Sequence, residues 1–331
     1  MPHRPLHALC LPAALLGLLA CALASLALGS RTLGPAAVWQ ALTQPDDSYV
    51  SLIVSSRVPR TVLAILTGAA LAVSGAIAQA LTRNPLADPG LLGVNAGAAA
   101  SLVGTALIAG SMPAHPFWAA LPGALAAAAV VHLVGAGGRG RSNPARLVLT
   151  GAALNAVLFA FVQAVALVRD DIFDVYRFWA IGSLSGHSLA AAWQAVPYVA
   201  AGLALAALLA RALNLLTLGG TLASTLGARA GPARLLGLFC MTLLAAAATA
   251  AVGPIAFVGL AVPHLARRLA GADQRWLMLY CALLGPILML VADILARVLR
   301  APAEVLTGVI VALLGAPFLL AALRRSARTA A

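Results

Sequence analysis

Charged residues in this chain are separated by apolar stretches of about 20 residues or near-multiples of that length, and about 20 apolar residues span a bilayer as a helix. Only 9% of the 331 residues are charged and 62% are hydrophobic, and the mean hydropathy is +0.99. A chain of this composition lacks the polar residues that a soluble domain needs on its surface. The sequence therefore predicts an all-α, polytopic membrane protein.

The apolar stretches predict about ten transmembrane helices in a single transmembrane domain, residues 1–331. The expected spans are Ala8–Leu28, Thr61–Leu81, Leu92–Gly110, Phe117–Val134, Leu147–Leu167, Ala190–Ala210, Leu235–Val252, Ile255–Leu269, Trp276–Leu295 and Val305–Leu323. The eighth is the least regular. Gly253 and Pro254 leave a very short turn before it, and Pro263 would bend it or end it early.

The basic residues set the expected orientation. The formal net charge is +12, carried by 21 arginines and no lysine, and their dispersal between apolar stretches argues against a nucleic-acid surface. An even number of spans places both termini on one side together with most arginines, whereas the other side carries Asp46, Asp47, Asp170, Asp171, Asp174 and Glu304. The positive-inside rule makes both termini cytoplasmic. We expect a multi-pass protein in the lipid of the cytoplasmic (inner) membrane.

The N-terminal stretch after Arg4 also has features of a signal peptide, and Leu18–Cys21 loosely resembles a lipoprotein cleavage site. Because Ala8–Leu28 is longer than the ~7–15 apolar residues of a signal peptide, an uncleaved first span is favoured. The four cysteines show no CxxC spacing. Neither a disulfide framework nor a metal site is therefore expected.

Missing residues disfavour several classes of function. A P-loop needs a lysine, so ATP would have to be bound and hydrolysed by a separate subunit. The protease motifs HExxH and GxSG are absent, which argues against an intramembrane enzyme. An ion-coupled secondary transporter needs an ionisable residue near the bilayer centre. Asp293 comes closest, but its spacing favours an i,i+4 pair with Arg297.

Two polar segments between spans are distinctive. The first, Arg83–Gly97, is expected to be a cytoplasmic turn in which Pro85 and Pro89 stop the helix and the side chains of Asn84 and Asp88 cap turns. It leads into a GxxxG pair at Gly93 and Gly97 that favours close helix packing. The second, Leu213–Gly227, is amphipathic and is expected to lie on the membrane surface, as a short helix pair or as an ordinary loop.

These segments belong to a longer set of motifs. They are Arg57-Val58-Pro59-Arg60, Gly68–Gly75 with Gln79, Arg83–Gly97, Phe178-Trp179 with Gly182-Ser183-Leu184, Gly253–Leu260 with Pro263-His264, and Gly315-Ala316-Pro317. On these residues the chain resembles, over nearly its whole length, the iron-siderophore and vitamin B12 (FecCD-type) permease family of ABC importers.

The resemblance implies a type II, B12-permease-like fold with ten helices per subunit. It implies four kinds of partner: a second permease subunit as homo- or heterodimer, two cytoplasmic ATPase subunits that hold ATP and Mg, a periplasmic substrate-binding protein, and lipid. No cofactor is expected in this chain itself. An iron-siderophore chelate is the first choice of cargo, haem or cobalamin are the alternatives, and a passive channel is the rival that needs no ATPase.

The resemblance also implies roles for particular residues. Arg57, Arg60 and Arg297 would dock acidic residues of the binding protein, in the way that charge pairs orient partners. The alternative is that they are arginines at helix ends whose side chains reach the membrane surface. ATPase coupling would fall on Leu213, Asn214, Leu218, Gly219, Leu222, Leu226 and Gly227, although Gly220-Thr221 replaces the acidic residue of many relatives. The signature turn comprises Arg83, Asn84, Pro85, Asp88, Pro89 and Gly93, and no gate is assigned at 138–146.

Overall fold

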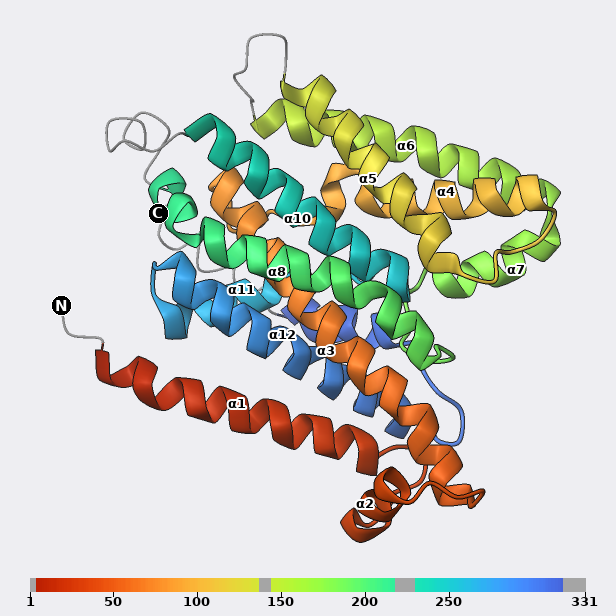
Figure 1. The fold of residues 1–331 in the computed structure, drawn as a ribbon. Coiled ribbons are helices and arrows are strands. Elements are labelled where there is room, and N and C mark those ends of the chain that lie inside the picture. The colour runs from red at the N-terminus through yellow and green to blue at the C-terminus, as the bar shows by residue number, and fades with distance from the viewer. Residues whose placement is uncertain (1–3, 137–143, 218–229, 318–331) are drawn as a thin grey trace.

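The computed structural model describes residues 4–136, 144–217 and 230–317, which form helices joined by turns, with no strand in these ranges (Figure 1). The helices are α1 (Arg4–Ala27), α2 (Pro35–Thr43), α3 (Tyr49–Thr82), the 3-10 turn η1 (Pro89–Leu92), α4 (Val94–Ala109), α5 (Pro116–Ala136), α6 (Pro144–Val168), α7 (Asp170–Trp179), α8 (Leu189–Thr217), α10 (Ala230–Val252), α11 (Val258–Ala270) and α12 (Gln274–Val298). A last helix covers Thr307–Pro317.

Each of the ten predicted spans coincides with one of these helices, which confirms the all-α membrane fold. Seven helices in the described ranges are long and apolar enough to cross a membrane, namely α1, α3, α5, α6, α8, α10 and α12. α4 and the last helix are apolar but shorter. α11 has 13 residues, about 20 Å at the usual rise. It runs through Pro263 without ending there.

The segments predicted to be polar connections are more helical than expected. α3 begins at Tyr49, twelve residues before the predicted span, because Ser48 caps it and Pro59 is accommodated inside the helix. With 34 residues, α3 measures about 51 Å, longer than the ~30 Å hydrocarbon layer. The connection before α8 contains α7, whose N-terminal Asp170 and C-terminal Arg177 complement the helix dipole.

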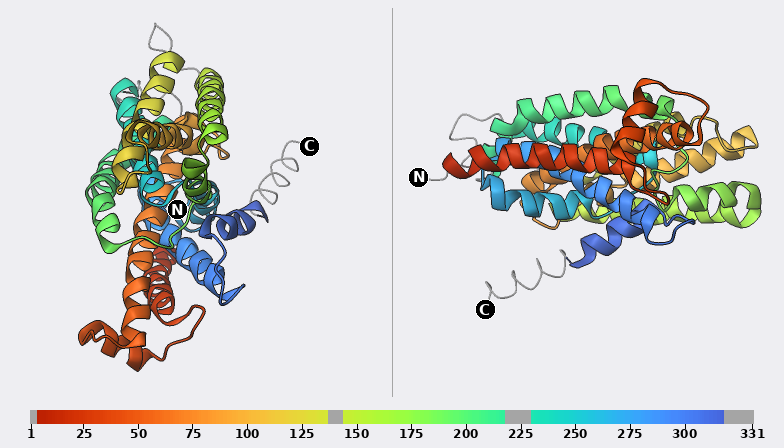
Figure 2. Two further views of the ribbon diagram at one scale, coloured as in Figure 1. Left: turned by 90° about the vertical axis from the view of Figure 1, so that its right-hand side faces the viewer. Right: turned by 90° about the horizontal axis from the view of Figure 1, so that it is seen from below.

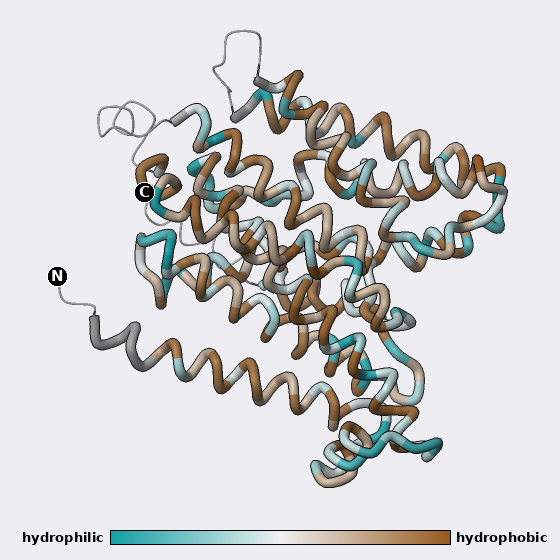
Figure 3. Tube along the Cα trace, viewed as in Figure 1, coloured by the Kyte–Doolittle hydropathy of each residue, from teal (hydrophilic) through white to brown (hydrophobic). Residues whose placement is uncertain are grey.

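α3 is the central helix of the bundle. It packs against α8, α10, α11 and α12. Within its most apolar stretch of 18 residues, 83% is buried inside the bundle. By contrast, only 6% and 17% of the corresponding stretches of α1 and α6 are buried, so most of their apolar residues are exposed. Figure 3 shows both helices as largely hydrophobic segments at the edge of the bundle. Figure 2 shows that the last helix leaves the main group of helices instead of running along α12.

Glycines allow the closest helix contacts, as the small-residue pattern predicts. A Cβ atom on Gly68 of α3 would lie 2.6 Å from the carbonyl oxygen of Gly285 in α12. A Cβ atom on Gly75 would overlap the carbonyl group of Gly259 in α11. Larger residues at these two positions would force α3 away from both neighbours, so the core of the bundle depends on them.

Candidate functional site

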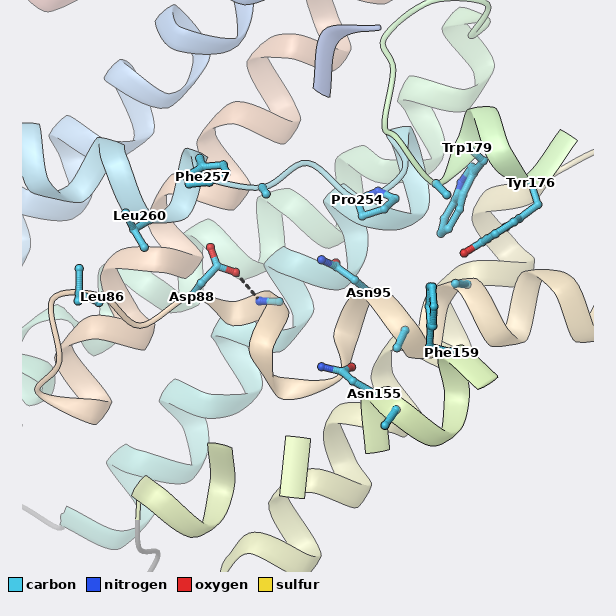
Figure 4. Close-up of a pocket in the computed structure, with 16 residues that line it drawn as sticks. Leu86, Asp88, Asn95, Asn155, Phe159, Tyr176, Trp179, Pro254, Phe257 and Leu260 are labelled. Atoms are coloured by element: carbon cyan, nitrogen blue, oxygen red, sulfur yellow. Dashed lines mark hydrogen bonds between the residues drawn. The ribbon is translucent and has the colours of Figure 1, made fainter. Parts of the chain in front are cut away.

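A cavity of about 750 Å³ lies between η1, α4, α6, α7 and the turn that precedes α11 (Figure 4). Most of its lining is apolar, and Asp88, Asn95 and Asn155 supply polar side chains. The remaining lining residues include Phe159 of α6, Tyr176 and Trp179 of α7, and Pro254, Phe257 and Leu260 near the start of α11. A cavity of this size, mostly apolar with a few polar groups, is typical of small-molecule sites.

The signature turn forms one end of this cavity, and its predicted caps are present. Arg83 ends α3 in the left-handed conformation with φ 52°. The side chain of Asn84 accepts a hydrogen bond from the amide of Leu86 at 3.0 Å, and that of Asp88 accepts one from Gly90 at 2.7 Å. Pro89 then begins η1. Two prolines and two short capping side chains therefore produce the turn that the sequence predicts.

The end of η1 joins the turn to the helix bundle. Gly93 has φ 85°, a conformation that suits glycine and turns the chain directly into α4. Two residues later, the Asn95 side-chain oxygen accepts a hydrogen bond from the Thr249 hydroxyl of α10 at 3.0 Å. Burial raises the pKa of Asp88, against the effect of the hydrogen bond from Gly90. The polar groups of this turn are thus used mainly to hold its shape.

The three predicted docking arginines are buried near the opposite end of α3 and α12. Two of them bind the carbonyl end of α1. Arg57 donates hydrogen bonds to the carbonyl oxygens of Leu26, Ala27 and Arg31 at 2.7–2.9 Å. Positive charge at a helix C-terminus satisfies free carbonyls and the helix dipole. The C-terminal end of α1 is therefore held in place by a guanidinium from α3.

Arg297 binds the same end of α1 from the other side. It donates to the carbonyl and hydroxyl oxygens of Ser25 at 2.9 and 3.0 Å. It also pairs with Asp293, one turn earlier in α12, at 3.0 Å. The i,i+4 pair that the sequence predicts is thus confirmed. Direct contact of Arg57 or Arg297 with another protein would require them to leave these bonds.

Arg60 differs because one of its partners reaches solvent. It lies 2.8 Å from the buried carboxylate of Asp293 and 2.7 Å from that of Glu304. The Glu304 side chain is 34% exposed, and its carboxylate also accepts a hydrogen bond from the Ser185 hydroxyl at 3.2 Å. Neither Ser185 nor Glu304 was predicted from the sequence to belong to a site. Their only signal was a polar side chain in a predicted external turn.

The start of the predicted coupling segment joins α8 to α12. Leu213 is fully buried. Asn214 donates from its amide to Asp273 at 2.8 Å and accepts from the backbone of Gln274 at 2.7 Å. Asp273 is itself the N-cap of α12. The last turn of α8 therefore completes the cap of α12. Leu218, Gly219, Leu222, Leu226 and Gly227 lie outside the described residues.

No group of three or more His, Cys, Asp or Glu side chains within the described ranges is placed to hold a metal ion.

A further polar contact that was not predicted from the sequence joins α3 to α11. Arg267 donates a hydrogen bond to the side-chain oxygen of Gln79 at 2.5 Å, and the side-chain amide of Gln79 donates to the carbonyl of Gly259 at 3.2 Å. Gln79 is buried. These side chains are used in helix packing.

Comparison with known proteins places this geometry in a family. The FecCD transport family profile matches residues 17–325. The ferric enterobactin transport system permease protein FepD of Escherichia coli (strain K12) is 43% identical over 327 residues, covering 97% of each chain. The hemin transport system permease protein HmuU of Yersinia pestis is 40% identical, covering 93% of this chain and 95% of the relative.

A solved structure has the same fold. A metal-chelate type ABC transporter in an inward-facing conformation superposes with a TM-score of 0.83 at 28% identity, covering 96% of this chain and 99% of that one. The resemblance to the iron-siderophore permeases, and among them to the ferric-enterobactin permease, agrees with the match to FepD. This chain belongs to the FecCD transport family.

Proposed function

We propose that the chain is the permease subunit of an ABC importer that carries an iron-siderophore chelate across the cytoplasmic membrane. The observation that carries this proposal is the 43% identity, over 97% of both chains, to the ferric enterobactin permease FepD. The cavity agrees with it in size, because about 750 Å³ of mostly apolar space with a few polar groups lies within the range of small-molecule sites.

The second candidate cargo is haem, since HmuU is 40% identical over 93% of this chain. Uptake into a strain lacking this gene separates the candidates. Labelled ferric enterobactin, haem and cobalamin are supplied one at a time, with and without the gene restored on a plasmid. Gene-dependent uptake of ferric enterobactin supports the siderophore proposal. Gene-dependent uptake of haem or cobalamin alone would replace it, and uptake of none of the three would contradict it.

The proposed transporter contains a second permease subunit beside the cavity. The outward face of α6 is apolar and exposed, with Leu149, Val157 and Phe159 each more than half exposed. Phe159 also lines the cavity. A second permease covering this face would enclose the cavity between two subunits. Crosslinking through a cysteine placed at Val157 in the assembled complex tests this arrangement, with a cysteine at the outward-facing Leu16 of α1 as the control.

The proposed ATPase contact is the segment from Leu213 to Gly227, at the end with most arginines. ATP and Mg would be held by the ATPase subunits. Asn214 supports this role, because its bonds to the cap of α12 anchor the start of the segment to the bundle. Replacement of Leu218 and Leu222 by Asp should abolish co-purification of the ATPase while the permease still inserts in the membrane. Retained co-purification would contradict the assignment.

The binding protein would dock at the opposite end, near Arg60. Arg57 and Arg297 would shape this surface by holding α1, while Arg60 would exchange its exposed partner for a carboxylate of the binding protein. The double variant Arg57→Glu, Arg60→Glu should abolish uptake and the stimulation of ATPase by the binding protein. Unchanged stimulation would exclude the docking proposal. If stimulation is lost, the single variant Arg60→Glu, which leaves the contacts of Arg57 with α1 in place, separates a docking defect from a displaced α1.

A further inference from the structure

Glu304 lies where the turn after α7, α3 and the segment before the last helix meet. It precedes the last helix, and its carboxylate accepts hydrogen bonds from Arg60 of α3 through both oxygens, at 2.7 and 3.0 Å. The Ser185 hydroxyl, from the turn after α7, reaches the same carboxylate at 3.2 Å. One partly exposed side chain therefore joins three segments that are distant in sequence.

The turn that Glu304 contacts is tightly packed against the cavity wall. The amide of Gly308 in the last helix donates to the carbonyl of Gly182 at 3.0 Å, and Ser183 donates to the end of α10, at Val252, at 2.9 Å. A Cβ atom on Gly182 would lie 2.6 Å from the carbonyl oxygen of Pro254. Pro254 lines the cavity. Displacement of this turn would therefore shift the wall.

The same turn directly follows two other residues of the wall. Trp179 and Ala180 line the cavity, and the amide of Gly182 donates to the carbonyl of Trp179 at 3.1 Å. Ser185, which binds Glu304, is thus only a few residues along the chain from these wall residues. Arg60, the other partner of Glu304, is fixed by the buried Asp293. The carboxylate bridges a fixed cation and a segment of the wall.

We infer that Glu304 is a positioning residue for transport: through Arg60 and Ser185 it holds Trp179 and Ala180 in place as the external wall of the cavity. Its carboxylate is the exposed anion of the cluster, so a carboxylate from an external partner can replace it on Arg60 without breaking the buried pair with Asp293. Such an exchange would free the turn and open the wall. The inference rests on the proposed function, in which the cavity opens alternately to the two sides.

The test measures access to the wall from outside. In the assembled transporter in liposomes, Ala180→Cys is exposed to a membrane-impermeant thiol reagent on the external side, and labelling is followed by mass spectrometry. Addition of Glu304→Gln should speed labelling about tenfold, because a charge-assisted hydrogen bond is lost. Ser185→Ala should give a smaller increase, and Glu304→Asp should restore slow labelling. The matched control is Asp47→Asn, an external acid outside this cluster, which should change nothing.

An internal control separates this role from general loosening of the fold. Native Cys240 is fully buried in α10, so its labelling reports global opening. The inference is upheld if Glu304→Gln speeds labelling at residue 180 but not at Cys240. It is overturned if labelling at 180 is unchanged, or if both positions react faster together. Because labelling needs neither ATP nor cargo, this failure is distinct from a failure of the uptake experiment.

Discussion

Replacement of Asp293 by Asn probes the buried charges at the C-terminal end of α12, because it removes a carboxylate and preserves the size of the side chain. Asp293 lies 2.8 Å from Arg60 and 3.0 Å from Arg297. Three cations, those of Arg57, Arg60 and Arg297, face two anions, those of Asp293 and Glu304. The substitution changes the net charge of this cluster from +1 to +2.

The structure sets the expected magnitude. Removal of one partner of a buried ion pair costs about 3–5 kcal/mol, and Asp293 is the partner of two buried arginines. We therefore expect Asp293→Asn to lower the free energy of unfolding by at least about 4 kcal/mol. Glu304→Gln removes a carboxylate that is 34% exposed. Water can solvate the remaining arginine there, so the expected loss is about 1–2 kcal/mol.

The assay is unfolding of the purified protein in detergent by a denaturant, followed by circular dichroism. The double variant Asp293→Asn, Arg297→Gln should be less destabilised than the sum of its two single variants, because it returns the charge of the cluster to +1. The reasoning is refuted if Asp293→Asn costs no more than Glu304→Gln, or if the effects of the double variant are additive.

Three further outcomes follow from particular contacts. Gly75→Val should abolish folding, because the new side chain would overlap the backbone of α11. The control Gly231→Ala should fold normally, because no atom lies within 4 Å of the new Cβ. The yield of monodisperse protein measures both outcomes. Asn214→Ala should lower the unfolding free energy by about 1–2 kcal/mol in the same denaturant assay, because it removes the cross-helix cap of α12. The hydrogen bond from Arg169 lowers the pKa of Asp171 to about 2. Its stabilising effect is therefore complete above pH 3.8 and is lost as the pH falls toward 2, so the unfolding midpoints of Asp171→Asn and the unmodified protein should keep a constant difference between pH 5 and 8.

Local patterns predicted the parts of the site that depend on neighbouring residues. The capped turn at Asn84 and Asp88 follows from spacings of one or two residues, and the pair of Asp293 and Arg297 follows from the repeat of a helix. In each case both partners lie on one element whose conformation the sequence indicates. The ten spans were predicted for the same reason, since hydropathy is summed over a contiguous stretch.

The partners of Arg60 could not be predicted in this way. Glu304 is 244 positions away in the sequence, and the two meet only because α3 and α12 pack along their lengths. The burial of Arg57 was likewise hidden, because an arginine near a helix end usually extends to the membrane surface. Here α3 begins eight residues before Arg57, so Arg57 lies within the helix and not at its N-terminal end, as the predicted span had implied. An error in one helix boundary thus changed the expected environment of the arginines.

α12 connects the two ends of the proposed transport site. At one end, the cap of α12 at Asp273 binds Asn214, where the proposed ATPase contact begins. At the other end, Asp293 binds Arg60, beside the proposed docking surface. The 20 residues between the two carboxylates span about 30 Å as a helix, which is the thickness of the hydrocarbon layer. One continuous helix therefore joins both proposed contact regions, and its charged residues lie near its two ends. Three charges at these ends have partners: Asp273 binds Asn214 of α8, Asp293 binds Arg60 of α3, and Arg297 binds Ser25 of α1, while the helix between them stays apolar.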